Sequence, residues 1–147
     1  MSQPLVTAWN DNEIFRCPLL IKEQHLDTFG HVNNAVYLTL LEEARWDFIA
    51  GRGFSVAEIQ KNGLGPTVLE FNIKFKRELK LRQKIVIESQ TISYEKKIGY
   101  LRQDILNEAG ELCCQGIMTM GLFDTRERKL VMPPPEWLRA IGIKGAP

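Results

Sequence analysis

One ten-residue segment holds most of the polar side chains that could do chemistry. It reads His-Leu-Asp-Thr-Phe-Gly-His-Val-Asn-Asn over residues 25–34, and it carries both histidines of the chain with Asp27 between them. A helical pattern of apolar residues begins directly after it. Because a helix N-terminus exposes unpaired N–H groups and a partial positive charge, it favours an anion or a polarised carbonyl oxygen. A carboxylate beside such donors is the minimum equipment for acyl transfer.

Asp27 is the candidate acid of this segment. It would either activate a water as a general base or attack a carbonyl itself. The alternative is that Asp27 and Asn33 serve only as turn and cap residues, which is a common use of these residue types before a helix. Spacing alone leaves both interpretations open.

The elements that must position this segment follow from the periodicity. A long helix is expected from Asn33 or Asn34 to Ala50, with Gly51 as its left-handed stop. A capping box at Ser55–Glu58 predicts a second, short helix that ends at Asn62-Gly63. The apolar stripe of the long helix consists of Tyr37, Leu41, Ala44 and Phe48, widened by Leu38 and Ile49.

Strand-like runs make up most of the remaining chain. One short run precedes the helix and four long runs follow it, and turns containing Gly or charged residues separate the later ones. The runs cover residues 16–24, 68–75, 84–94, 98–107 and 112–123. We expect the four later strands to form an antiparallel meander, so the fold class is α+β, with one dominant helix on one face of a sheet.

Length and composition describe an ordinary globular chain. Its 147 residues, 44% hydrophobic and 25% charged, predict one domain over residues 1–147, with an N-terminal arm (1–12) and a C-terminal tail (133–147). A formal net charge of +1 gives no general attraction to nucleic acid or to an anionic membrane. Because no signal-peptide pattern or membrane-spanning apolar run is found, we expect a soluble cytoplasmic protein.

The three cysteines, Cys17, Cys113 and Cys114, are expected to be buried or half-buried reduced thiols. An odd number cannot close a complete set of intramolecular disulfides. With two histidines in the chain, no zinc motif can be assembled, so we expect no metal site.

The segment from His25 to Phe48 resembles the hotdog-fold thioesterases of the 4-hydroxybenzoyl-CoA thioesterase family, most of all the branch of bacterial long-chain acyl-CoA thioesterases. The family pattern is an acid, a glycine, a short run with asparagine, and then tyrosine, glutamate and arginine along a helix. The matching residues are Asp27, Gly30, Asn33, Asn34, Tyr37, Glu42 and Arg45. Residues 67–75 resemble the family's second strand more loosely.

The resemblance implies a hotdog fold, in which a five-stranded antiparallel sheet wraps one long central helix. It implies a homodimer or homotetramer built by edge-to-edge pairing, with the active site at the subunit interface. The implied reaction is hydrolysis of a medium- to long-chain fatty acyl-CoA to free acid and coenzyme A. No cofactor is implied, because coenzyme A enters as part of the substrate. An acyl carrier protein is a second candidate carrier of the acyl group.

The resemblance also assigns roles to single residues. Asp27 matches the base or nucleophile, and the backbone N–H of Asn34 matches the donor to the thioester carbonyl. Gly30 and Glu42 complete the expected catalytic set. Glu42 has three candidate roles: lining the pocket, holding the Asp27 loop, or pairing with Arg45 on the helix.

Five further residues are expected to bind substrate: His31, Asn33, Tyr37, Lys76 and Arg77. Tyr37 has a packing role as its alternative, and His31 would hydrogen-bond near the carbonyl. Lys76 and Arg77 belong to the basic stretch 74–84. This stretch either forms a solvated face or holds the phosphates of coenzyme A or of a carrier's prosthetic arm.

Two other functions fit the same fold. A hotdog dehydratase would depend on His31, but the Gly-His-Phe-Pro sequence of those enzymes is absent, because Val32-Asn33 follows Gly30-His31. A non-catalytic acyl-CoA-binding module would keep the fold without turnover.

Overall fold

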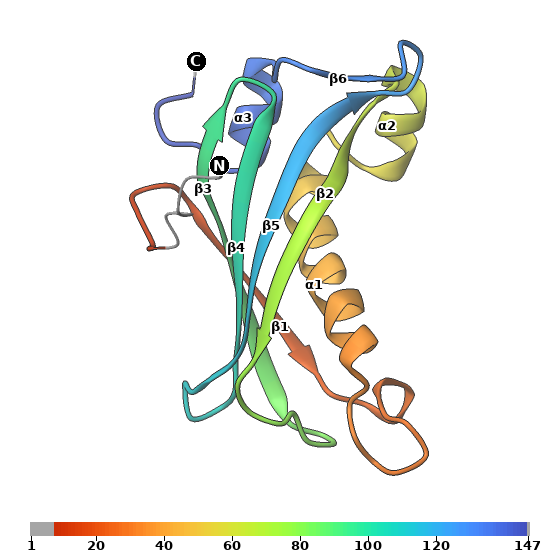
Figure 1. The fold of residues 1–147 in the computed structure, drawn as a ribbon, viewed down its shortest axis with the longest axis vertical. Coiled ribbons are helices and arrows are strands. Elements are labelled where there is room, and N and C mark those ends of the chain that lie inside the picture. The colour runs from red at the N-terminus through yellow and green to blue at the C-terminus, as the bar shows by residue number, and fades with distance from the viewer. Residues whose placement is uncertain (1–7, 147) are drawn as a thin grey trace.

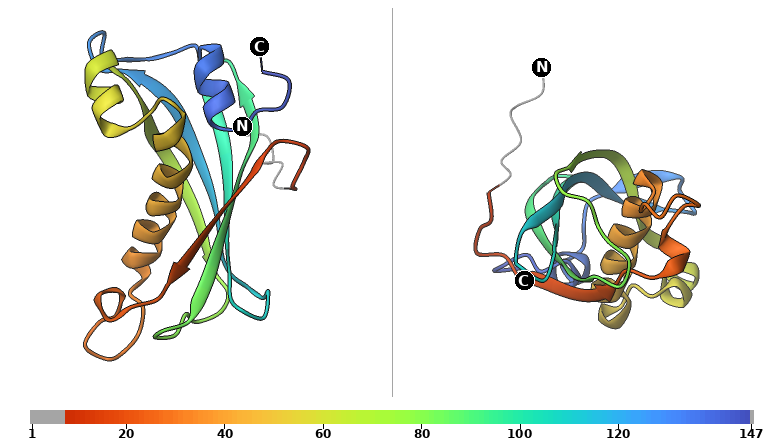
Figure 2. Two further views of the ribbon diagram at one scale, coloured as in Figure 1. Left: turned by 180° about the vertical axis from the view of Figure 1, so that it is seen from behind. Right: turned by 90° about the horizontal axis from the view of Figure 1, so that it is seen from below.

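The computed structural model describes residues 8–146, which form an antiparallel sheet beside one long helix (Figure 1). The strands are β1 (Ile14–Leu20), β2 (Leu64–Phe75), β3 (Lys84–Glu95), β4 (Ile98–Leu106), β5 (Leu112–Asp124) and β6 (Lys129–Val131). The helices are α1 (Asn34–Ile49), α2 (Val56–Asn62) and α3 (Pro135–Ala140), with 3-10 turns at Glu23–His25 and Ala50–Arg52. Seen end-on, the sheet curves around α1 (Figure 2), which confirms the α+β hotdog architecture.

The strand order is β1-β3-β4-β5-β2, and the short β6 adds to β5. The expected five strands are present, but the prediction of a four-strand meander is wrong, because β2 pairs with β5 and not with β3. The reason lies in the connection 76–83. Leu79 is only 1% exposed and packs into the core, so this segment crosses the end of the sheet and does not form a tight hairpin. Strands β1 and β2 are left as the two edges.

Helix α1 begins and ends close to the predicted positions and buries Tyr37, Leu40, Leu41, Ala44, Phe48 and Ile49. Leu38, expected to widen the buried stripe, is 41% exposed, and Leu40 takes that role. The predicted stop at Gly51 is also wrong. The chain continues through a 3-10 turn, and Gly53, with a φ of 95°, supplies the left-handed residue.

Helix α2 follows its predicted capping. The Ser55 hydroxyl oxygen accepts a hydrogen bond from the Glu58 N–H at 3.2 Å, and Gly63 ends the helix at a φ of 77°. Together with the turn after Ile49, α2 lies at one end of the molecule, while the loop that precedes α1 lies at the other (Figure 1).

Both chain ends pack against the sheet where they are described. The predicted arm lies partly outside the described residues, but Asn10 and Asn12 hydrogen-bond to the backbone of β3 at Ile92 and Thr91, at 2.8 and 2.7 Å. The segment 133–147, expected as a tail, contains α3, and its Trp137 is 1% exposed in the core. Helix α3 therefore packs against the core and belongs to the folded domain.

All three thiols are buried and unpaired with one another, as predicted. Burial raises the pKa of Cys17 to about 11, with nearby Asp47 adding to the effect, and burial raises the pKa of Cys114 to about 12. The thiol of Cys113 is shifted in the same direction by burial. Because the thiolate is the reactive form, these groups should be inert in the folded protein.

We expect the native protein to react very slowly with a thiol reagent such as DTNB at pH 8. A thiol with a pKa near 11 is ionised in only about one molecule in a thousand at that pH. Denaturant should then expose all three thiols, and the colour released reports the count. Fast reaction of one thiol without denaturant would contradict the buried placement.

Candidate active site

The loop before α1 is a tight hairpin built around Asp27. Leu26 and Val32 form an isolated antiparallel bridge, and the Asp27 N–H donates to the His31 carbonyl at 2.9 Å. Gly30 turns the chain with a φ of 81°, and its N–H donates to the Asp27 carbonyl at 3.1 Å. A left-handed φ of this kind favours glycine, which explains Gly30 in the pattern.

The side chain of Asp27 is fixed by the same hairpin. Its Oδ1 accepts the backbone N–H groups of Phe29 at 2.9 Å and of His31 at 3.1 Å. The turn role expected for Asp27 is therefore real. The residue is also exposed, and the two N–H donors fix the orientation of the carboxylate.

Helix α1 starts with an unused donor. Asn33 is the cap: its Oδ1 accepts from the Ala35 N–H at 2.8 Å, and its carbonyl accepts from the Val36 N–H at 2.9 Å. Asn34 is the first helical residue, and within residues 8–146 its N–H donates to no protein acceptor. The exposed Asn34 N–H is thus available to a ligand at the positive end of the helix dipole.

A shallow groove of about 440 Å³ lies at this end of α1. It brings together five of the predicted site residues: His31, Asn34, Tyr37, Lys76 and Arg77. Val32, Phe75 and Glu78 complete its lining. Asp27, Gly30 and Asn33 belong to the adjoining hairpin and cap, not to the groove wall.

Tyr37 has the packing role that was its alternative. Its side chain is 5% exposed, and its ring meets Phe75 edge to face with centroids 5.0 Å apart. Burial raises the pKa of the Tyr37 hydroxyl, although a hydrogen bond with the Leu79 backbone opposes this shift. Tyr37 therefore stays neutral and holds the floor of the groove.

Charges line the rim of the groove. His31 Nε2 lies 3.8 Å from Glu78 Oε1, and Arg77 pairs with Glu111 at 3.1 Å. Both pairs are more than two-fifths exposed, so they add little stability. Among the described residues Lys76 makes no ion pair, so its ammonium is available to an anionic ligand.

Glu42 is not placed with Asp27 in the folded chain. It lies eight residues beyond Asn34 on α1, about 12 Å along the helix, where it lines a separate cavity of about 100 Å³. Glu42 and Arg45 do not form a close ion pair among the described residues, although the Glu42 charge acts on the Arg45 guanidinium and opposes the lowering of its pKa by burial. Arg45 Nη1 donates a hydrogen bond to Gln103 Oε1 at 3.0 Å, and its guanidinium lies over the Phe71 ring.

The cavity beside Glu42 was not predicted from the sequence. Its apolar wall comes from α1, β2, β4, β5 and the segment at α3, and includes Phe48, Leu101, Met118, Met120 and Trp137. The spacing of Met118 and Met120 on β5 could have indicated this apolar wall, because residues two apart on a strand share a face of the sheet. Trp137 gave no such signal, because it follows three prolines in a segment interpreted as a tail.

No cluster of three or more His, Cys, Asp or Glu suited to a metal ion occurs in residues 8–146. Within the same range, none of the helices is long and apolar enough to cross a membrane.

The fold and the match to a family model define a hotdog-fold hydrolase of the thioesterase class. A family model described as the thioesterase-like superfamily matches residues 21–141, and the chain belongs to that superfamily.

Individual relatives agree with this class. The chain is 33% identical over 110 residues to the long-chain acyl-CoA thioesterase FadM of Escherichia coli K12, covering 74% of this chain and 83% of FadM. DHNA-CoA thioesterase from Staphylococcus aureus has a similar structure, with a TM-score of 0.76 and 24% identity over 86% of this chain and 87% of the other. SAV2348 from the same organism, solved in complex with CoA, has a TM-score of 0.81 at 18% identity over 95% and 85% of the two chains. The two structural likenesses establish the fold alone.

Proposed function

We propose that this chain hydrolyses acyl-CoA thioesters with medium- to long-chain fatty acyl groups. The observation that carries the proposal is the unpaired Asn34 N–H at the start of α1, next to a hairpin that presents an oriented Asp27 carboxylate. Similarity to FadM supports the choice of a fatty acyl-CoA. The buried reduced thiols fit a cytoplasmic location.

In the proposed reaction the thioester carbonyl oxygen accepts the Asn34 N–H. The partial positive charge of the helix N-terminus stabilises the oxyanion that forms when the carbonyl carbon is attacked. Asp27 either takes a proton from the attacking water or attacks the carbon itself, giving an anhydride that water then opens. Both routes consume one water and give the free acid and coenzyme A. Because thiols ionise near pH ~8.5, the thiolate can leave without a strong general acid.

The remaining predicted residues take supporting roles in this proposal. Lys76 and Arg77 bind phosphate groups of coenzyme A from the rim of the groove, and His31 lies close enough to the helix start to hydrogen-bond the substrate there. Asn33 acts as the N-cap of α1. Its side chain and carbonyl accept the N–H groups of Ala35 and Val36, and the Asn34 N–H is the donor left for the substrate. Glu42 belongs to the acyl path along α1 and not to the reacting atoms.

The test is thiol release from a series of saturated acyl-CoAs that rises by two carbons, with the same acyl groups on an acyl carrier protein in parallel. We expect release from the coenzyme A esters, with a maximum at medium to long chains. Release from the carrier esters alone would show that the natural substrate is an acyl group on acyl carrier protein and not on coenzyme A. Tight acyl-CoA binding with no release from either series would contradict the proposal and favour a binding module.

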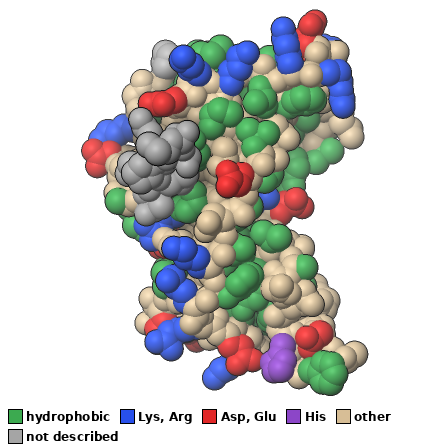
Figure 3. Space-filling view, viewed as in Figure 1, with side chains coloured by type: hydrophobic (Ala, Val, Ile, Leu, Met, Phe, Trp, Pro, Cys, Tyr) green, Lys and Arg blue, Asp and Glu red, His purple; other side chains and the backbone are tan. Residues whose placement is uncertain are grey.

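We further propose that two copies join along β2. This edge strand is twelve residues long, and Val68, Leu69 and Phe75 on it are about half exposed. Apolar side chains gather over this part of the surface (Figure 3). An edge with unpaired backbone groups and apolar side chains favours strand addition, which would shield the groove from water.

Leu69→Glu is expected to break this association. A buried unpaired charge at an interface core costs more than an ordinary contact gives, so the variant should be monomeric in light scattering at concentrations where the wild type is not. Turnover should fall with it, because the open groove would stay hydrated. Thr39→Glu is the control, since Thr39 is also exposed but lies outside β2. A wild type that is already monomeric and fully active would contradict the proposal.

A further inference from the structure

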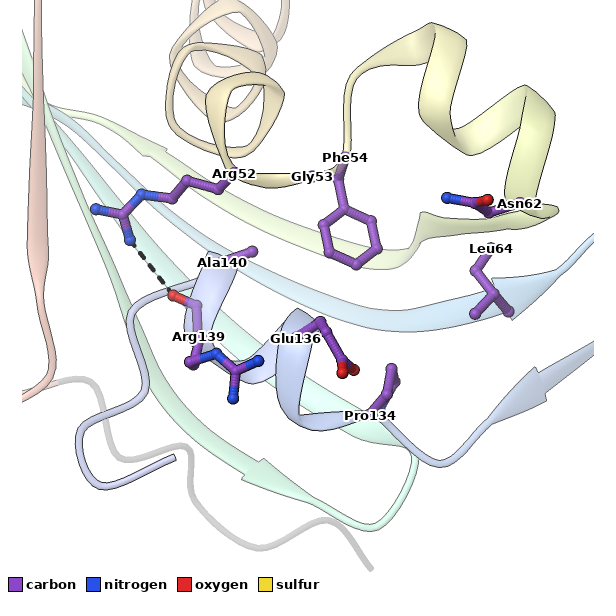
Figure 4. Close-up of a pocket in the computed structure, with 9 residues that line it drawn as sticks. All are labelled: Arg52, Gly53, Phe54, Asn62, Leu64, Pro134, Glu136, Arg139 and Ala140. Carbon is purple, nitrogen blue, oxygen red and sulfur yellow. Dashed lines mark hydrogen bonds between the residues drawn. The ribbon is translucent and has the colours of Figure 1, made fainter. Parts of the chain in front are cut away.

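Two hollows lie near the C-terminal end of α1. One is the apolar cavity of about 100 Å³ that begins at Glu42, and the other is an open groove of about 560 Å³ (Figure 4). Helix α3 contributes to both: Trp137 and the following Ile141 line the cavity, whereas Glu136 and Ala140 line the groove. The groove is lined by Arg52, Gly53 and Phe54, which follow the C-terminal end of α1, whereas Asn34 is the first residue of that helix.

Two other parts of the chain, α1 with the turn after it and β2, also contribute side chains to both hollows. Along α1 and the turn after it, Phe48 and Ile49 line the cavity, and Phe54 lines the groove. On β2, Pro66 lines the cavity and Leu64 the groove. On each of these elements, residues that line the cavity lie close in sequence to residues that line the groove, so the two hollows are neighbours.

The separating side chains are a packed aromatic pair. The rings of Phe54 and Trp137 meet edge to face, with centroids 4.8 Å apart and planes at 71°. Phe54 is 8% exposed and Trp137 is 1% exposed, so both are held by the core. Figure 4 shows the Phe54 ring directed from the end of α1 toward α3. One member of the pair faces each hollow, which makes the pair a partition.

We propose that Phe54 and Trp137 are specificity-determining residues that close the acyl path and set the longest acyl chain the site accepts. This inference rests on the proposed function. The cavity of about 100 Å³ has room for the volume of about three liquid waters, so it takes the last few carbons of a chain and then ends. A longer chain meets two fixed rings, and only beyond them does the larger groove offer space.

The test is kcat/KM over the series of saturated acyl-CoAs for the wild type and for Phe54→Ala. The wild type should show a sharp fall above one chain length. In Phe54→Ala this fall should move to longer chains, with a gain of about tenfold or more for the first esters beyond the wild-type limit, since one methylene in an apolar pocket changes rates by about that much. Shorter esters should be little affected.

Leu122→Ala is the matched control. Leu122 is 0% exposed in the same core cluster, but it lines neither hollow, so its loss should lower stability without moving the length limit. Trp137→Leu opens the partition from the other side and should move the limit in the same direction. If one of these two variants fails to fold, the other still decides the question.

Binding of free fatty acids, measured by calorimetry over the same lengths, gives a readout independent of turnover. A wild type that binds fatty acids up to a limit, with a longer limit in Phe54→Ala but no hydrolysis, would remove the proposed function and keep the partition. An unchanged length limit in folded Phe54→Ala and Trp137→Leu, in turnover and in binding, would overturn the partition.

Discussion

Asp27→Asn is expected to lower kcat by about 10²- to 10⁴-fold, the usual contribution of a positioned general base. Asparagine keeps the oxygen that accepts the Phe29 and His31 N–H groups, so the hairpin should hold its shape. It cannot take a proton from water, and it is a poor nucleophile. The loss should therefore appear in kcat, while the thermal unfolding midpoint stays within a few degrees of the wild type.

Asp47→Asn is the matched control for this variant. Asp47 is an exposed acid near the other end of α1, so the same change of one carboxylate to an amide should leave kcat unchanged. If both variants lose activity equally, the effect comes from net charge and not from Asp27.

Asn34→Pro is expected to lower kcat by about 10²- to 10³-fold, as removal of one oxyanion donor does in other hydrolases. Proline is well tolerated at the first position of a helix, where its missing N–H breaks no intrahelical bond. The preceding residue must be extended, and Asn33 already is, at φ −63° and ψ 141°. The substitution thus deletes the donor and keeps the helix.

Asn34→Ala separates the backbone from the side chain. It retains the N–H and removes the amide group, so kcat should stay within a few-fold of the wild type. Circular dichroism of both variants should match the wild type. Strong loss in Asn34→Ala, with little loss in Asn34→Pro, would assign the position's role to its side chain and contradict an oxyanion donor at the helix start.

Local features of the site were predictable because short-range chemistry determines them. An acid and a glycine three residues apart close a hairpin, and an asparagine before an apolar helical pattern caps that helix. Asp27, Gly30 and Asn33 therefore lie where the sequence placed them, and Ser55 and Gly63 bound α2 as expected.

Long-range features were not predictable in the same way. The pairing of β2 with β5 depends on the buried Leu79 in a connection whose charged residues suggest only a surface turn. The hydrogen-bond partner of Arg45 is Gln103 on β4, whose buried side-chain amide also donates to the Leu41 carbonyl of α1. Periodicity describes one element at a time, so it carries no information about such partners.

The position of Trp137 shows the same limit most clearly. Three prolines before it indicate the end of a folded region, yet α3 begins within them and buries the tryptophan against Phe54. Proline is well suited to the first turn of a helix, so the same residues that break one element begin another. The Trp137 wall of the cavity beside Glu42 was missed for this reason.

In the proposed function, Asp27 and the start of α1 cleave an acyl thioester. Thiol release from one medium-chain acyl-CoA by the wild type, Asp27→Asn and Asp47→Asn, measured in a single assay with folding of each checked by circular dichroism, decides whether this is so. We predict catalysed release by the wild type and Asp47→Asn, and a rate at least about a hundredfold lower for Asp27→Asn. Equal release by folded wild type and Asp27→Asn would contradict the account.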